Sequence, residues 1–147
     1  RRETEKSGVM YLDNPKEYLR QLRRLEICIE QRQEELNRLR ELIGSLSVNY
    51  DERVRHSSSA DGIPNEVARR IELEDDISRK IEQFLQLKHK IINEIQSLND
   101  YTYSSILYKR YVEYKSLEEI AVEMNYSYIH IRRMHGYALQ EFKINIK

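Results

Sequence analysis

Alternating steps of three and four residues separate the apolar positions in two long stretches of the chain. The first stretch has Tyr18, Leu22, Leu25, Ile29, Leu36, Leu39, Ile43 and Leu46, interrupted by Arg32. The second has Ile77, Ile81, Phe84, Ile91, Ile95 and Leu98, interrupted by Lys88. This spacing is typical of a helix whose narrow apolar face packs against another helix. The charged interruptions are candidate determinants of register or oligomeric state, or long side chains whose heads reach solvent.

Residues typical of helix ends and loops delimit these two stretches. Asn14, Pro15 and Glu17 form a helix-start pattern, with Asn as N-cap and Pro at the first helical position. The segment 47–64 is rich in Ser and also contains Gly and Pro, so we predict a loop there that lets the chain reverse. Residues 14–100 are therefore predicted to form an antiparallel helical hairpin, or part of a larger coiled coil. The spacing leaves open whether the apolar seam closes within one chain or between two chains.

The composition changes after Asn99 and Asp100. Eight of the 11 tyrosines lie between residues 101 and 147. This segment has seven Lys or Arg and five Glu, whereas residues 1–100 have 18 basic and 20 acidic residues. We therefore predict a second, compact domain at 101–147, whose small basic excess has the sign expected for a nucleic-acid-binding segment.

Three short helices are predicted in this C-terminal segment. The first covers Ser104 to Tyr111, and the second begins after a capping box that Ser116 and Glu119 form. Asn125 tolerates the positive φ of a sharp turn, and Ser127 is the expected N-cap of the third helix. The predicted inward faces are Ile106, Leu107, Tyr108 and Tyr111, then Leu117, Ile120, Ala121 and Met124, then Ile131, Met134, Ala138, Leu139 and Phe142. A small residue at the close helix crossing, as Ala121 is, favours a helix-turn-helix.

The run from Ser116 to Ser127, SLEEIAVEMNYS, and the run IRRMHGYAL at 131–139 resemble region 4 of bacterial sigma factors. The layout of the whole chain is similar to small phage-encoded transcriptional regulators of the ArpU and RinA type from Firmicutes. The resemblance implies a recognition helix from Ser127 that enters the major groove of promoter DNA. The positions that contact the −35 element in sigma factors fall here on Tyr128, Ile129, Arg132 and Arg133. The sequence departs from the sigma pattern at Ile129, usually an acidic or polar reader, and at Asn125, often Gly.

The residue types on this helix independently favour contact with DNA. A guanidinium at Arg132 or Arg133 can read guanine bidentately or bind a phosphate, although two solvated arginines are the simpler alternative. Tyr128 and His130 lie near the start of the helix, where they can donate to a phosphate or pack on a thymine methyl group. Ser127 is primarily a cap, and capped helix starts also accept phosphates.

Three further cations flank the first two short helices. Lys109, Arg110 and Lys115 are candidates for sequence-independent contact with the DNA backbone, with solvated side chains as the alternative. Most tyrosines of the segment are interpreted as packing residues rather than as platforms for bases. We assign packing roles to Tyr108, Tyr111 and Tyr114. We expect Tyr101 and Tyr103 to pack the C-terminal domain against the hairpin.

Enzyme chemistry has little support in this sequence. The four histidines show no metal-type spacing with one another or with Cys28, and no nucleophile motif or Gly-rich phosphate loop occurs. We therefore expect no catalytic residues, no metal and no cofactor. The sequence has no apolar run of the length of a membrane span and no signal peptide, which favours the cytoplasm of a bacterial host cell. Residues 1–13 are interpreted as a disordered leader or a segment added for expression.

These features predict an all-α protein in which a long antiparallel helical hairpin precedes a small C-terminal helix-turn-helix domain. The leading functional hypothesis is a sequence-specific DNA-binding transcription regulator, a phage or prophage late-gene activator. Double-stranded DNA is the expected partner, with RNA polymerase and a second copy of the chain, paired through the hairpin, as further candidates. One alternative is a small terminase-like DNA-packaging adaptor, and another is a coiled-coil interaction protein that does not bind DNA.

Overall fold

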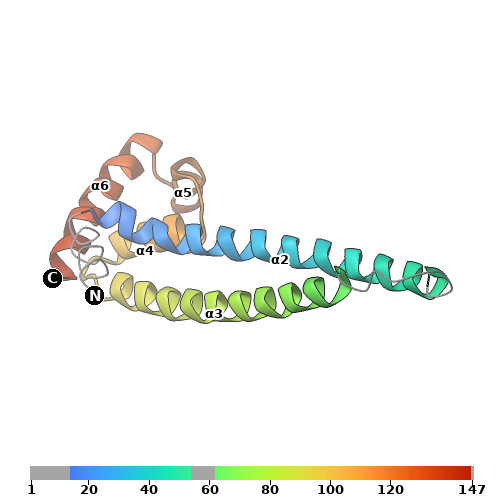
Figure 1. Cartoon of the computed structure of the whole chain (residues 1–147). Coiled ribbons are helices and arrows are strands. Elements are labelled where there is room, and N and C mark those ends of the chain that lie inside the picture. Colours follow the sequence, from blue (N-terminus) through green and yellow to red (C-terminus); the bar gives the residue numbers. More distant parts are fainter. Residues whose placement is uncertain (1–13, 54–61, 147) are drawn as a thin grey trace. The chain divides into compact units, whose positions relative to one another are not determined.

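A computed structural model describes residues 14–53 and 62–146 and shows five α-helices in this part of the chain (Figure 1). The helices are α2 (Pro15–Arg53), α3 (Gly62–Gln96), α4 (Tyr101–Tyr111), α5 (Leu117–Met124) and α6 (Tyr128–Asn145). The two long helices, α2 and α3, pack antiparallel as a hairpin, and the three short helices that follow pack together (Figure 1). The predicted fold class is confirmed. The expected leader, residues 1–13, lies outside the described residues.

The ends of the long helices differ in part from the prediction. The start of α2 agrees with it, because the backbone N–H of Glu17 donates to Oδ1 of Asn14 at 3.3 Å. The loop predicted at 47–64 is too long, since α2 continues to Arg53 and α3 begins at Gly62. Residues 47–53 contain neither Gly nor Pro, and Pro64 lies in the first turn of α3, where the lack of an N–H costs no hydrogen bond. The remainder of the predicted loop, 54–61, lies outside the described residues.

The apolar seam of the hairpin closes within one chain. In the compact unit formed by Leu25–Gln83, the buried side chains of Leu36, Leu73 and Ile77 form a cluster between α2 and α3. Ion pairs flank this cluster, with N···O distances of 2.9 Å for Arg40–Glu74, 3.0 Å for Arg69–Glu35 and 3.7 Å for Arg32–Asp76. In this structure the seam is therefore packed between two helices of the same chain.

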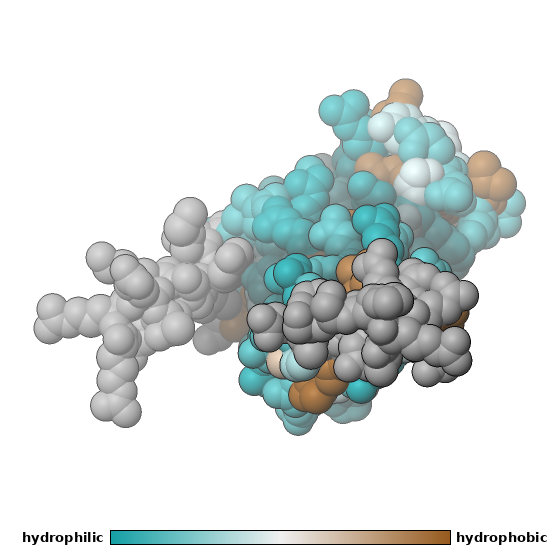
Figure 2. Space-filling model, turned by 45° about the vertical axis from the view of Figure 1, so that its right-hand side comes forward, coloured by the Kyte–Doolittle hydropathy of each residue, from teal (hydrophilic) through white to brown (hydrophobic). Residues whose placement is uncertain are grey.

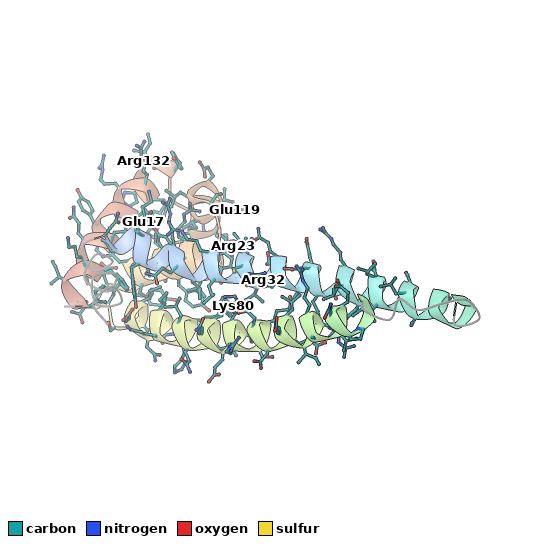
Figure 3. The ribbon with its side chains drawn as sticks, viewed as in Figure 1. Glu17, Arg23, Arg32, Lys80, Glu119 and Arg132 are labelled. Atoms are coloured by element: carbon teal, nitrogen blue, oxygen red, sulfur yellow. The ribbon has the colours of Figure 1, made fainter. Side chains whose placement is uncertain are left out.

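The charged interruption of the first seam reaches solvent. The side chain of Arg32, labelled in Figure 3, is 45% exposed and pairs with both Glu35 and Asp76. The methylene groups of Arg32 can therefore lie along the apolar seam while its guanidinium group remains in solvent. The second seam differs slightly from the prediction, because Ile81 is exposed whereas Leu73, outside the predicted set, is buried.

The second compact unit joins the base of the hairpin to the C-terminal helices. It contains the described residues up to Arg24 and from Phe84 onward. Its largest cluster comprises Tyr18, Leu19, Leu22, Ile91, Ile95, Leu98, Leu107, Tyr111, Val112, Ala138 and Phe142. The hydroxyl of Tyr18 donates to Glu94 Oε2 at 2.7 Å, which satisfies the one polar group of the ring as it packs. The boundary between the two compact units therefore differs from the domain boundary predicted at residue 100. Residues of α2 and α3 share this core with α4 and α6.

The first short helix begins earlier than predicted. α4 starts at Tyr101 rather than Ser104, because Asp100 is its N-cap and accepts hydrogen bonds from the backbone N–H groups of Thr102 and Tyr103. Tyr103 packs against the large cluster as expected. Tyr101 is 84% exposed, so the expectation that it seats the C-terminal segment on the hairpin is wrong. Its position on the first turn of α4 turns its side chain toward solvent.

A smaller cluster holds the three short helices together. It is formed by Ile106 of α4, Ile120 and Ala121 of α5, and Ile131 of α6. Leu117, Met124 and Met134 pack around it. Each of these residues belongs to a predicted inward face, so the 3.6-residue period predicted this core correctly.

Candidate nucleic-acid interface

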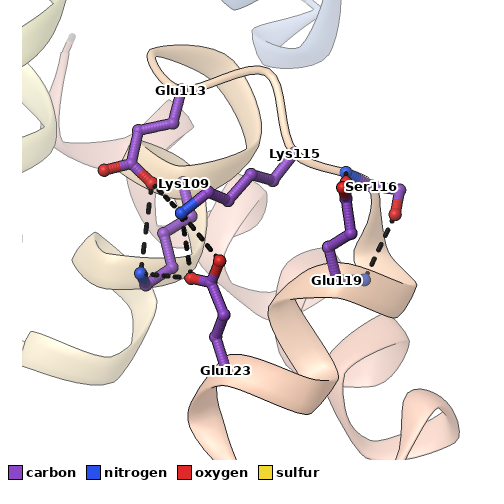
Figure 4. A network of polar contacts seen from close by, with 6 residues as sticks. All are labelled: Lys109, Glu113, Lys115, Ser116, Glu119 and Glu123. Atoms are coloured by element: carbon purple, nitrogen blue, oxygen red, sulfur yellow. Dashed lines mark hydrogen bonds and ion pairs between the residues drawn. The ribbon is translucent and has the colours of Figure 1, made fainter.

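The start of α5 is fixed by a reciprocal pair of hydrogen bonds. Ser116 Oγ accepts from the backbone N–H of Glu119 at 3.2 Å, and Glu119 Oε2 accepts from the backbone N–H of Ser116 at 2.7 Å (Figure 4). The bond from the Ser116 backbone is the main reason that the pKa of Glu119 lies below its usual value. The predicted capping box is confirmed, and it sets the start of the helix that supports α6.

A three-residue connection turns the chain from α5 into α6. Asn125 adopts the left-handed conformation with φ 57° and ψ 40°, and the backbone N–H of Tyr126 donates to the carbonyl of Ala121 at 3.0 Å. Ser127 Oγ then accepts from the backbone N–H of His130 at 3.2 Å and caps α6. Ala121 is buried, with 5% of its surface exposed, as a small residue at a close crossing should be. The roles predicted for Asn125 and Ser127 in this turn are confirmed.

The first turns of α6 present one exposed face. Tyr128, Ile129, His130, Arg132 and Arg133 are all exposed, whereas Ile131 between them is fully buried. Ile129 is 70% exposed, so an apolar side chain lies on the same surface as the two arginines. The rings of His130 and Tyr126 lie 5.0 Å apart, centroid to centroid. The structure therefore brings together all the sequence-predicted residues that belong to α6 and its cap.

The two arginines of this face have no partner among the described residues. No side-chain hydrogen bond or ion pair involves Arg132 or Arg133 within residues 14–53 and 62–146. Arg132 is labelled in Figure 3, on the exposed side of α6. Within the described part of the chain, nothing competes with an external acceptor for the donors of these two guanidinium groups.

The three cations before α6 are placed differently. Lys109 Nζ lies 2.7 Å from Glu123 Oε2, and Lys115 Nζ lies 2.8 Å from Glu123 Oε1 and 2.8 Å from Glu113 Oε2 (Figure 4). The hydrogen bonds that Lys115 donates to these carboxylates raise its pKa, and those that the two lysines donate to Glu123 lower the pKa of Glu123. Arg110 Nη1 donates to the carbonyl of Lys115 at 2.8 Å. A DNA phosphate would have to compete with these internal partners for the same donors.

A buried pair behind the exposed face was missed by sequence reasoning. Nε2 of His135 lies 3.0 Å from the hydroxyl oxygen of Tyr111, and the two rings stack with centroids 5.8 Å apart. Burial is the main cause that lowers the pKa of His135 to about 4, with the charges of Arg110, Lys16 and Arg20 acting in the same direction. The signal was present in the sequence, because His135 lies four residues after Ile131 and three before Ala138 on the buried face.

Apolar residues also lie exposed near the turn. Val122 of α5 is 79% exposed, and Tyr126 and Tyr128 are 43% and 41% exposed. In the view of Figure 2 the described surface is mostly hydrophilic, with hydrophobic residues in small separate patches. Together with Ile129, these side chains give the region around the turn a mixed cationic and apolar character.

Among the described residues, no group of three or more His, Cys, Asp and Glu side chains is placed to hold a metal ion. None of the described helices combines the length and the apolar character that a membrane crossing requires. Comparison with protein-family models, curated proteins and solved structures finds nothing that matches the chain.

Proposed function

We propose that this protein is a transcription regulator that binds duplex DNA and places the first turns of α6 in the major groove. The observation that carries the proposal is the exposed face of α6, where Arg132 and Arg133 have no partner within the described residues. This face follows a tight turn and begins at a capped helix start. Such a combination of turn, cap and outward arginines is what a recognition helix needs.

Each residue of the face has a role in this proposal. Arg132 and Arg133 read guanine edges or bind phosphates, since a guanidinium offers two parallel donors to either. Ile129 and Tyr128 pack on thymine methyl groups, the apolar feature of the major groove. The α6 N-terminus, which Ser127 caps, lies near the sugar-phosphate backbone, where helix N–H groups favour an anion. Lys109 and Lys115 contribute long-range attraction more than direct contacts, because both ammonium groups already pair with Glu123. Arg110 adds its charge to this attraction, and its Nη1 already donates to the Lys115 carbonyl.

A gel-shift comparison at several salt concentrations tests the proposal. The probes are duplexes from the neighbourhood of the gene and a random-sequence duplex pool. The double variant Arg132→Ala, Arg133→Ala is expected to bind at least roughly tenfold more weakly than the wild type, since removing a bidentate guanidinium–guanine pair costs about 1–3 kcal/mol. The dependence of log affinity on log salt should also become shallower, by about 0.9 for each phosphate that the variant no longer neutralises.

A matched control variant separates the effect of losing the Arg132 and Arg133 contacts from the effect of losing two positive charges. Arg38→Ala with Arg79→Ala removes the same charge from exposed hairpin side chains that pair with Glu34 and Asp75. This control should retain near-wild-type affinity. The proposal fails if the wild type binds no duplex, or if both double variants lose the same affinity.

RNA polymerase and a second copy of the chain are further partners in this proposal. A regulator whose net charge is formally zero gains little affinity from its overall field, so a second binding surface would raise its occupancy on DNA. Leu42 and Ile71 are 48% and 55% exposed on the hairpin and offer apolar surface to such a partner. Light scattering separates the dimer from a ring-shaped packaging adaptor.

A further inference from the structure

A glycine lies on the solvent-facing side of α6. Gly136 is near the middle of this 18-residue helix and is exposed. Glycine is the poorest helix former after proline, because its backbone loses the most conformational freedom when it is ordered. At an interior helical position it therefore makes α6 less stable than alanine would.

Neither the backbone nor the internal packing requires glycine at this position. The backbone of Gly136 is helical and its φ is not positive, so a residue with a side chain can adopt the same conformation. A Cβ atom added to Gly136 would meet no atom of a neighbouring element within 4 Å. The described part of the chain thus contains no neighbour that needs the space beside Gly136.

Gly136 shares a face of α6 with the residues proposed to contact DNA. It follows Arg133 by three residues, Arg132 by four and Ile129 by seven, and these spacings place residues on one side of a helix. All four residues are exposed, whereas Ala138, on the other side of α6, is fully buried. With a rise of about 1.5 Å per residue, Gly136 lies only about 4.5 Å along the helix axis from Arg133.

The charge of this face favours a polyanion over a second protein surface. Arg132 and Arg133 are cationic, and none of the exposed residues of α6 is acidic. The carboxylate of the helix, at Glu141, is partly buried. Duplex DNA presents phosphates and guanine acceptors to such guanidinium groups, so they do not have to be buried unpaired.

The width of the major groove limits how closely α6 can approach the bases. The groove is about 12 Å wide, and a helix with its side chains is about 10–12 Å across. The helix therefore fits with little space to spare, and the side chains on its inward face set the distance between its axis and the base edges. Gly136 removes one such side chain, one turn beyond the arginines.

We propose that α6 comes closest to duplex DNA at Gly136, whose missing side chain lets the helix lie deep enough in the major groove for Arg132 and Arg133 to reach base edges. This role depends on the proposed function of α6 and makes Gly136 a residue that determines sequence specificity. If the helix were held further out, the arginines would reach phosphates only, which carry no direct sequence information.

Gel shifts with two probes test this role: a duplex that the wild type selects from a random-sequence pool, and the unselected pool. Gly136→Leu should bind the selected duplex more weakly by roughly tenfold or more, the loss expected when a bidentate guanidinium–base contact is broken. Gly136→Ala should show a smaller loss in the same direction. Both variants should bind the unselected pool nearly as the wild type does, because every positive charge is retained.

The melting temperature separates a contact with DNA from a structural role. Gly136→Ala should raise it by about 2–4 °C, since alanine favours a helix more than glycine does. A variant that is more stable and yet binds the selected duplex more weakly has kept its fold and lost a contact with DNA. Gly44 is the matched control, because it is exposed inside α2 and a Cβ added there also meets no atom within 4 Å. Gly44→Leu should bind both probes as the wild type does.

The outcomes distinguish this role from the proposed function. If Gly136→Leu binds the selected duplex as tightly as the wild type while the Arg132, Arg133 double variant does not, the role of Gly136 is overturned and the proposed function stands. Equal losses on the two probes, or a selection that enriches no sequence, would also overturn the role. A changed oligomeric state of Gly136→Leu with unchanged DNA affinity would place a second protein chain on this face instead. Both proposals fail together only if the wild type binds no duplex.

Discussion

His135 is a buried titratable residue whose neutral form fits its surroundings. The unprotonated Nε2 can accept a hydrogen bond from the hydroxyl of Tyr111, 3.0 Å away, and protonation would remove that acceptor. Burial and the nearby cations Arg110, Lys16 and Arg20 also disfavour the imidazolium form. The residue is 9% exposed, so solvent screens these effects only weakly.

This burial predicts a pH dependence of stability. The pKa of His135 is about 4 in the folded protein and about 6.5 when unfolded, so the unfolded chain binds the proton more strongly between these values. The free energy of unfolding should therefore be fully maintained above pH 6.5 and fall as the pH drops toward 4. The loss from this residue is on the order of 3 kcal/mol. Urea unfolding at several pH values measures it.

Two variants test whether His135 causes this pH dependence of the free energy of unfolding. His135→Gln keeps a neutral polar side chain near Tyr111 and should flatten the pH dependence in this window. His89→Gln, at an exposed position of α3, should leave the slope unchanged. Equal slopes for the wild type and His135→Gln would show that other groups cause the acid sensitivity.

At the scale of the element, α5 is a short helix that depends on its ends. It spans eight residues, a length at which an isolated helix is unstable in water. The capping box at Ser116 and the left-handed Asn125 satisfy backbone groups that would otherwise lack partners. The position of α6 in turn depends on this short helix through the cluster around Ile120.

Ser116→Ala should destabilise the protein by about 1 kcal/mol, because it leaves the backbone N–H of Glu119 without its acceptor. Thermal or urea unfolding measures the change. Ser78→Ala is the matched control, since Ser78 is exposed within α3 and only donates back to the Glu74 carbonyl. That substitution should be neutral or slightly stabilising, because alanine has the higher helix propensity. Similar losses for the two variants would contradict the role given to the capping box.

The packing of the same short helices also explains why the candidate interface was only partly predictable. The exposed face of α6 follows from its 3.6-residue period and its cap, so Tyr128, Ile129 and Arg132 could be placed from the sequence. The ion pair of Lys109 with Glu123 could not be predicted, because Glu123 lies 14 residues away on another helix. Only the packing of α4 against α5 brings these two side chains together.

At the scale of the whole molecule, the hairpin base and the C-terminal helices share one core. Phe142 of α6 is fully buried in the same cluster as Tyr18 and Leu22 of α2 and Leu107 of α4. The ring centroids of Tyr18 and Phe142 lie 6.2 Å apart. A disturbance at one end of the chain should therefore reach the other end.

Phe142→Ala tests this coupling by hydrogen exchange. The variant should lose about 3–5 kcal/mol of stability, as large-to-small substitutions of a buried aromatic ring do. Amide protection should fall in the first turns of α2 and in α4 as well as in α6, because all three contribute to the same cluster.

Leu36→Ala is the comparison for this experiment. Leu36 belongs to the separate cluster with Leu73 and Ile77, so its loss should reduce protection mainly within Leu25–Gln83. Loss of protection confined to α6 in the Phe142 variant would show that the C-terminal segment folds independently of the hairpin base.

Residue types and their spacing were enough to predict the local structure: the two long helices, the capping box at Ser116, the turn at Asn125 and the cap at Ser127. These depend on hydrogen bonds and φ preferences within a few residues, which residue type and spacing encode directly. Only the tertiary structure shows how the seam packs between α2 and α3 and which residues, Tyr18 and Phe142 among them, share one core. Those features need side chains that are far apart in sequence, such as Tyr18 and Glu94, 76 residues apart, and no local period specifies which of them meet.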